Sequence, residues 1–190
     1  DEDGLIDYEV DALGGETWYE HNAYNERKMI ATPEGRTTGF EYDEWGNIIL
    51  LQQPDGESIR YKYNELGQLL ERTDSVGEKE TWQYDEEKRL IVYTNAVGTS
   101  VEYAYSNNSR LPFKANDSNG LEISWQYNSF GQLMFVADSE GMERNWEYDL
   151  FGRLAKEYNN NGYSKHWKRD EMGRVKAIYE SGQQPIKISY

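Results

Sequence analysis

Few side chains in this sequence could carry out catalysis. The two histidines, His21 and His166, stand far apart in the chain, and neither has a cluster of other metal ligands beside it. The chain has no cysteine, which excludes thiolate catalysis, cysteine-ligated zinc and disulfide bonds. No stretch resembles a phosphate-binding loop or a Ser-His-Asp set. We therefore predict no catalytic residue, no metal site, no cofactor and no enzymatic activity.

Carboxylate and amide side chains that recur at a fixed interval are the remaining candidates for chemistry. An Asp or Asn at the start of a turn accepts a hydrogen bond from the backbone two residues further on, which closes the turn. This single mechanism accounts for all of the recurring residues, so we predict a structural role for them. They are Asn22, Asp43, Asn64, Asp85, Asn128, Asp149 and Asp170.

The aromatic residues follow the same interval of 21 residues, with one interval of 22 between Tyr103 and Trp125. Tandem repetition of this length means that the chain is built from one small structural unit. We expect an acidic lead-in over residues 1–18 and an array of about eight repeats over residues 19–190. The repeats align at Tyr19, Phe40, Tyr61, Trp82, Tyr103, Trp125, Trp146, Trp167 and Ile188, and most carry a tyrosine two positions later.

Each repeat contains two turn signals, which we name the first turn and the second turn. The first turn is the Tyr-Asp-x-x-Gly stretch, and Asn25, Lys88 and Ser109 replace its glycine in three repeats. Glycine at these positions indicates a backbone with positive φ. The first turns end at Gly46, Gly67, Gly131, Gly152 and Gly173, and the second turns at Gly35, Gly56, Gly77, Gly98, Gly120, Gly141, Gly162 and Gly182.

The segments between the turns have six or seven residues, which suits strands better than helices. We therefore predict an all-β fold, in which tandem 21-residue β-hairpins form a long, curved antiparallel sheet. Curvature is expected because sheets of more than about ten strands seldom stay flat and open. The high aromatic content, 14% of residues, predicts that aromatic rather than aliphatic side chains make the core.

Alternation along the strands predicts which side chains share a face. We expect Leu121, Ile123, Trp125 and Tyr127 on one face. On the returning strand we expect Leu133, Phe135 and Ala137 to share a face.

Two local irregularities also carry predictions. The extra residue of the 22-residue interval falls beside Pro112, which predicts a β-bulge there because proline cannot donate to a strand ladder. The end hairpins should expose unpaired edges near residues 19–25 and 183–190. Exposed strand edges favour pairing with another chain, so we predict self-association.

Net charge and hydropathy exclude some classes of binding partner. The chain has 35 acidic and 20 basic residues, a net charge of -15, which argues against a nucleic-acid partner. No run approaches 18 apolar residues, so we predict no transmembrane segment. We expect any export signal to lie outside this chain.

The repeats resemble the YD-repeat (tyrosine-aspartate, Rhs) family over roughly residues 19–190. The resemblance rests on Trp146-Glu-Tyr148-Asp149-Leu-Phe-Gly152-Arg153-Leu154, with matching stretches at Phe40–Ile48 and Tyr61–Leu69. The family includes bacterial Rhs polymorphic toxins, parts of insecticidal toxin complexes and animal teneurins. Its repeats wind into a hollow β-shell, which in the bacterial members encloses a toxic C-terminal domain.

The resemblance implies a structural shell segment of an exported or cell-surface bacterial protein, with the rest of the shell and an enclosed toxin domain as partners. The family's shell-closing core element has no counterpart in this sequence. The repeat-defining residues that it implies are Tyr42, Asp43, Gly46, Tyr63, Gly67, Trp82, Tyr84, Asp85, Tyr105, Trp125, Tyr127, Gly131, Trp146, Tyr148, Asp149, Gly152, Trp167 and Gly173.

An alternative is a module that binds carbohydrate or a cell surface through its aromatic residues. Glucan- and choline-binding repeats are also aromatic hairpins of about 20 residues. They lack the Tyr-Asp-x-x-Gly-Arg-Leu order, so the shell interpretation is the stronger of the two.

Overall fold

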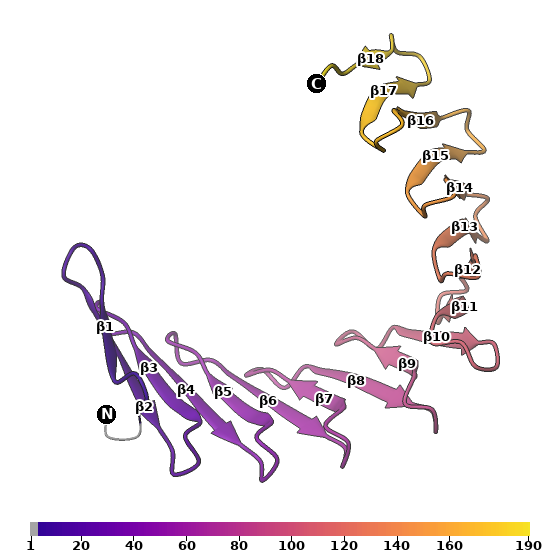
Figure 1. The fold of residues 1–190 in the computed structure, drawn as a ribbon. Helices are drawn as coiled ribbons and strands as arrows, with labels where there is room; N and C mark the ends of the chain where they lie inside the picture. Colours follow the sequence, from indigo (N-terminus) through magenta and orange to yellow (C-terminus); the bar gives the residue numbers. More distant parts are fainter. Residues whose placement is uncertain (1–3) are drawn as a thin grey trace. The chain divides into compact units, whose positions relative to one another are not determined.

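A computed structural model describes residues 4–190 of the chain, and within that range it contains strands and no helix (Figure 1). The all-β prediction is therefore confirmed. Residues 1–3, which belong to the predicted acidic lead-in, lie outside the described residues. The chain divides into two compact units, residues 1–100 and 101–190.

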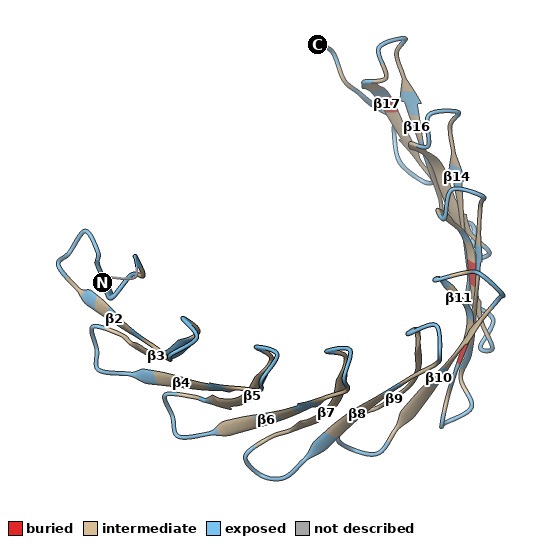
Figure 2. Ribbon diagram, turned by 60° about the horizontal axis from the view of Figure 1, so that its bottom comes forward, coloured by how far each residue is buried: buried red, intermediate tan, exposed pale blue. Residues whose placement is uncertain are grey.

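Unit 1 is an open antiparallel sheet in which each strand pairs with the next along the chain. Its successive strands do not lie in one flat plane (Figure 2). The strands are β1 (Tyr8–Val10), β2 (Glu16–His21), β3 (Arg27–Ala31), β4 (Thr37–Tyr42), β5 (Ile48–Gln52), β6 (Ser58–Tyr63), β7 (Leu69–Thr73), β8 (Lys79–Tyr84) and β9 (Leu90–Thr94).

Unit 2 repeats the same arrangement, again with antiparallel pairing between consecutive strands. Its strands are β10 (Ser100–Tyr105), β11 (Pro112–Asp117), β12 (Glu122–Tyr127), β13 (Leu133–Asp138), β14 (Glu143–Tyr148), β15 (Leu154–Asn159), β16 (Ser164–Arg169), β17 (Val175–Glu180) and β18 (Ile186–Lys187).

The first strand of the described chain corrects one prediction. Strand β2 pairs with β3 on one side and with β1 on the other, where Tyr8 lies opposite Trp18. The unpaired edge predicted near residues 19–25 is therefore wrong, because β1 covers it. Near residues 183–190, β18 pairs with β17 on one side, and no second partner occurs among the described residues.

A β-bulge occurs in each of the eight hairpins that a first turn closes. The strand register shifts by one residue where the tyrosine position meets the start of the returning strand. In the β12–β13 hairpin, Tyr127 lies opposite Leu133, while Gln126 lies opposite Phe135, so Met134 is the extra residue. Each bulge thus reverses the faces of the returning strand after its first residue.

This bulge overturns the predicted faces of β13. Directly opposed residues point to the same side of a sheet. Leu133 therefore shares the face of Tyr127, whereas Phe135 and Ala137, opposite Gln126 and Ser124, lie on the other face. Sequence alternation placed Leu133, Phe135 and Ala137 together because it contains no signal for the slip.

The extra residue of the 22-residue repeat is not a special bulge at Pro112. Pro112 lies opposite Tyr105, with the same register shift that every other hairpin has at this point. The connection from Tyr105 to Pro112 is instead one residue longer than its counterpart between Tyr127 and Leu133. The additional residue therefore lies in the turn.

Burial is low throughout, because each unit is a single layer of strands. Among the described residues only Ala115, Val136 and Ala177 are buried (red in Figure 2). Each lies on the middle strand of three, opposite larger side chains: Ala115 lies between Tyr103 and Ile123. The prediction of an aromatic core is therefore wrong. In a single layer of strands, the larger side chains on the two adjacent strands can cover a smaller side chain between them, but nothing covers the aromatic side chains themselves.

Candidate functional site: the repeated turns and the aromatic face

The first turns are held together by the recurring Asp or Asn. In the first turn of β14–β15, Asp149 Oδ1 accepts hydrogen bonds from the backbone N–H of Phe151 (2.9 Å) and of Arg153 (3.0 Å). Its Oδ2 accepts a bond from Arg153 Nε at 2.8 Å. Asn128 accepts the same two backbone bonds with its side-chain oxygen. Closure of the turn by this residue is therefore confirmed.

These bonds also set the acidity of the turn carboxylates. The side-chain hydrogen bond from Arg153 is the largest cause that holds the pKa of Asp149 below its ordinary value. For Asp170, the backbone N–H of Arg174 is the largest cause of a lowered pKa, and the Arg174 guanidinium adds to it. The carboxylates thus stay ionised and serve as hydrogen-bond acceptors rather than as acids.

The glycine positions of both turns have positive φ, as predicted. Where glycine is replaced, Asn25 and Lys88 adopt φ values of 64° and 67°. In the longer turn, however, Asn108 rather than Ser109 has positive φ, at 65°. Ser109, which aligns with the turn glycines in the sequence, therefore does not take the left-handed conformation, and the longer turn has that conformation one residue earlier.

First-turn glycines have a second role that the sequence did not reveal. The side chain that follows one first-turn glycine reaches the first turn of the next hairpin. Gln132 Nε2 donates to the carbonyl of Gly152 at 2.7 Å, and Gln68 Nε2 donates to the carbonyl of Lys88 at 3.0 Å. A Cβ on Gly173 would collide with the Arg153 guanidinium. Glycine here gives space to the neighbouring hairpin as well as freedom to the backbone.

The tyrosines of the repeat connect successive hairpins. Tyr148 donates its hydroxyl hydrogen to the carbonyl of Leu133, 15 residues earlier, at 2.8 Å. Tyr42, Tyr84 and Tyr190 make the equivalent bond to Arg27, Leu69 and Val175. Partial burial raises the pKa of Tyr84, so the hydroxyl keeps its proton for donation.

Arg169 shows that this bond survives the loss of tyrosine. Arg169 occupies the tyrosine position of its repeat, and its Nη2 donates to the carbonyl of Leu154 at 3.2 Å, again 15 residues earlier. The sequence alone marks Arg169 as a departure from the repeat. The signal that could have revealed the bond was the constant spacing of 15 between the tyrosine position and the first strand residue after the preceding first turn.

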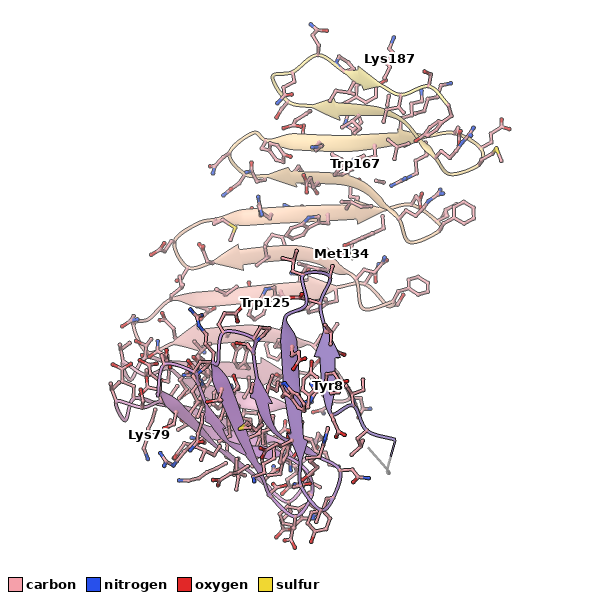
Figure 3. All side chains as sticks on the ribbon, turned by 90° about the vertical axis from the view of Figure 1, so that its left-hand side faces the viewer. Tyr8, Lys79, Trp125, Met134, Trp167 and Lys187 are labelled. Carbon is pink, nitrogen blue, oxygen red and sulfur yellow. The ribbon has the colours of Figure 1, made fainter. Side chains whose placement is uncertain are left out.

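The other predicted repeat residues lie on strands and in first turns. Trp82, Trp125, Trp146 and Trp167 lie on the first strands of their hairpins, on the face shared with the tyrosine position, and are partly buried (Trp125 and Trp167 are labelled in Figure 3). In unit 1 they accompany Tyr42, Tyr63 and Tyr84 on strands, and Asp43, Gly46, Gly67 and Asp85 in first turns. In unit 2 they accompany Tyr105, Tyr127 and Tyr148 on strands, and Gly131, Asp149, Gly152 and Gly173 in first turns.

The face of the sheet that carries the tryptophans and the repeat tyrosines, here called the tryptophan face, also carries charged groups. It is therefore not a purely apolar surface. Arg72 forms an ion pair with Glu80 at 3.0 Å, and Tyr93 donates to the same carboxylate at 2.5 Å. In unit 2, Lys165 pairs with Glu180 at 3.1 Å. Such paired charges beside aromatic rings suit a surface that faces water or a polar partner.

Large apolar side chains stand at the tips of the first turns. The residue before the turn glycine, or before Asn25 where that residue replaces it, is 60–86% exposed at six of these turns. In unit 1 these residues are Tyr24, Trp45 and Leu66, and in unit 2 they are Phe130, Phe151 and Met172. Exposed apolar residues that recur in one position mark a surface that another part of a protein covers.

Metal-ligating side chains do not form a cluster within residues 4–190. No group of three or more His, Asp or Glu side chains there could hold a metal ion. His166 stacks on Tyr179, with ring centroids 4.7 Å apart. None of the described elements is a helix long and apolar enough to cross a membrane.

Known structures share this fold. The crystal structures of TcdB2-TccC3-Cdc42 and of TcdB2-TccC3 without its hypervariable C-terminal region each match with a TM-score of 0.74 and 13% identity, over 88% of this chain and 11% of theirs. A Tc holotoxin pore of Photorhabdus luminescens matches with a TM-score of 0.66 and 13% identity, over 88% of this chain and 10% of that chain. The chain therefore spans about a tenth of the length of these solved chains.

Sequence comparison gives the family. No curated protein matches the chain. Residues 55–190 match the family model of the teneurin YD-shell, which places the repeats described above in a known group. Since that model covers most of the chain, this protein belongs to the teneurin YD-shell family.

Proposed function

We propose that this chain is a stretch of wall in a YD-repeat shell and that the shell encloses a C-terminal toxin domain. Residues 19–190 would be the wall, and residues 1–18 would lead into it. The observation that carries the proposal is the family match over residues 55–190, combined with side-chain bonds that join several of the hairpins to a neighbouring one. The fold shared with TccC3-containing toxin complexes supports the toxin as cargo.

The proposed role is structural rather than enzymatic. The repeat-defining Tyr, Asp and Gly residues already use their polar groups or their backbone freedom to close turns and to join hairpins. Residues that make these contacts stabilise the conformation of the hairpins. The family is a shell family, which supports the same assignment.

The remainder of the shell is the proposed partner of the exposed first-turn tips. Phe130 and Phe151 are more than 80% exposed in the described chain. Covering such side chains with another part of the shell would remove apolar surface from water, which is favourable at about 25 cal/mol per Å². Export from a bacterial cell, as for a toxin shell, is the localisation that this role implies.

The full-length product of the gene that encodes these residues provides the test. Electron microscopy should show a closed, hollow shell with the repeats in its wall. Its C-terminal region should resist a protease that digests the same region when it is expressed alone. Loss of that protection after mild urea treatment is the matched control.

Two outcomes would contradict the proposal. In one, the repeats form an open ribbon and the C-terminal region is digested as fast as the isolated region. In the other, the protein shows saturable binding to an oligosaccharide array through the tryptophan face, which would favour a carbohydrate-binding module.

A further inference from the structure

Three lysines without acidic partners gather on one side of unit 2. Six of the ten lysines in the chain form ion pairs, with N···O distances of 2.6–3.7 Å. Lys168, Lys176 and Lys187 form none with residues 4–190, although the protein carries a net charge of -15. In a protein with more carboxylates than basic groups, most lysines find an acidic partner. Three ammonium groups without one, close together, are therefore a distinctive feature.

The strand register brings these lysines together. Lys168 on β16 lies opposite Ala177 on β17, and Ala177 lies opposite Lys187 on β18 (Lys187 is labelled in Figure 3). Directly opposed residues share a face, so Lys168 and Lys187 flank Ala177, with backbones roughly 10 Å apart. Lys176, the extra residue of the β17 bulge, is the neighbour of Ala177 in sequence.

The three lysines line one surface pocket. Its volume is about 390 Å³, and Tyr179 and Ser189 add hydroxyl groups to its lining. Ala177, which is only 5% exposed, also lines it. The stacking of Tyr179 on His166 holds the tyrosine ring in place beside the pocket.

Three carboxylates of the surrounding hairpins already form ion pairs. Glu180 is paired with Lys165 and lies on the opposite face, since it is the partner of Lys165 in the register. Glu147 is paired with Lys156, and Asp170 with Arg174. Electrostatic interactions are screened beyond about 8 Å at physiological salt, so distant acidic residues do not neutralise the pocket.

We propose that this pocket binds a small soluble oxyanion, a phosphate or sulfate group. Lysine ammonium groups bind such anions as point charges, and hydroxyl groups can complete the hydrogen bonds. The volume lies near the lower end of the roughly 300–1,000 Å³ typical of small-molecule sites. The acidic remainder of the protein repels an extended polyanion or an anionic membrane, which leaves a compact anion as the ligand.

Titration of the 190-residue chain with inorganic phosphate and with pyrophosphate tests the proposal. Calorimetry should show saturable binding, and the backbone amide resonances of β16–β18 should shift. Lys168→Ala and Lys187→Ala should each weaken binding about tenfold, through loss of one charged hydrogen bond. Lys165→Ala, which removes a lysine already paired on the opposite face, should leave binding unchanged. Because Lys168 and Lys187 are exposed, circular dichroism should show that both variants fold.

Three results would overturn the proposal. The first is the absence of saturable binding, or binding that the Lys168 and Lys187 variants leave intact. The second is co-sedimentation with phosphatidic acid vesicles in the presence of excess free phosphate, which would identify a lipid headgroup as the ligand. The third is a dimer that Lys168→Glu abolishes, which would show that a carboxylate of a second copy fills the pocket.

Discussion

Two glycines of the same conformation illustrate what single residues contribute to this array. Gly162 and Gly173 have φ values of +85° and +83°. A Cβ on Gly162 would meet nothing within 4 Å, whereas one on Gly173 would collide with Arg153 of the preceding repeat. The first-turn glycine is therefore constrained by its neighbour as well as by its own backbone.

We expect Gly162→Ala to lower the free energy of unfolding by about 1 kcal/mol, because a left-handed backbone costs an L-residue about that much. Gly173→Ala should cost at least ~0.5 kcal/mol more, since the Arg153 guanidinium, which pairs with Asp149, must shift. Urea denaturation measures both. In an Arg153→Ala background the two costs should become equal, and a persistent difference would contradict this explanation.

Acid should destabilise the protein through the turn carboxylates. The pKa of Asp149 is below its ordinary value of 3.8 in the folded state, chiefly because of the hydrogen bond from Arg153. The folded state therefore binds fewer protons than the unfolded state. The resulting stability is complete above the ordinary pKa and is lost as the pH falls through the lowered pKa.

Asp149→Asn should make the urea midpoint less sensitive to pH below about 4, because asparagine keeps the two backbone hydrogen bonds, as Asn128 does. The reverse change, Asn128→Asp, should increase the sensitivity. Melts at pH 6 and pH 3 compare the variants with the parent. Equal acid sensitivity in all three proteins would exclude the turn carboxylates as its source.

Among the elements, each hairpin depends for its stability on the hairpin that precedes it in the chain. A hydroxyl or guanidinium at the tyrosine position bonds a carbonyl 15 residues earlier, at the preceding bulge. An isolated hairpin is marginal in water, so these bonds between hairpins add to the strand ladder where it is interrupted.

Tyr148→Phe should lower the free energy of unfolding by about 1 kcal/mol, the value of one lost hydrogen bond. Arg169→Tyr should be neutral or stabilising, because it restores the hydroxyl and removes the buried Arg169 Nε, which has no hydrogen-bond partner. Thermal and urea melts of the two variants give both values. A marked loss of stability in Arg169→Tyr would mean that arginine has a role of its own there.

Tryptophans on the strands should contribute less than core residues do. Trp146 is only partly buried, so Trp146→Ala should cost about 2 kcal/mol, below the 3–5 kcal/mol of a fully buried aromatic residue. Trp45, at a first-turn tip and 65% exposed, is the matched control, and Trp45→Ala should stay within about 0.5 kcal/mol. Equal losses of stability in Trp146→Ala and Trp45→Ala would contradict the prediction that strand tryptophans contribute more than those at first-turn tips.

At the scale of the whole molecule, each unit lacks a second layer that would cover its faces and its turn tips. The three buried residues are too few to form a continuous core. Stability in such arrays comes from contacts between neighbouring repeats, which makes the structure extensible and leaves its apolar groups available to other surfaces.

The 190-residue chain should therefore self-associate in a concentration-dependent manner, which sedimentation velocity can measure. Phe130→Ser combined with Phe151→Ser should reduce the association, because it removes two exposed first-turn tips. Val76→Ser with Val97→Ser, which alters second turns, is the control and should have little effect. A monomer at all concentrations would contradict the prediction.

Local structure follows from the sequence alone. A turn depends on residues within about four positions of one another, so Asp149, Gly152 and their equivalents specified the hairpins, the positive φ values and the all-β fold. Even Lys88 follows this rule, since the turn around it imposes the left-handed backbone.

Features that depend on register across strands emerge in the three-dimensional structure and not before. A slip of one residue reverses every side chain on a strand, and alternation in the sequence does not record where the slip occurs. The bulge placed Phe135 opposite Gln126, the bond of Tyr148 to Leu133 crosses 15 residues, and Lys168 meets Lys187 only across β17. The low burial of the side chains likewise results from the single layer of strands. The sequence of one repeat does not show whether a second layer will cover it.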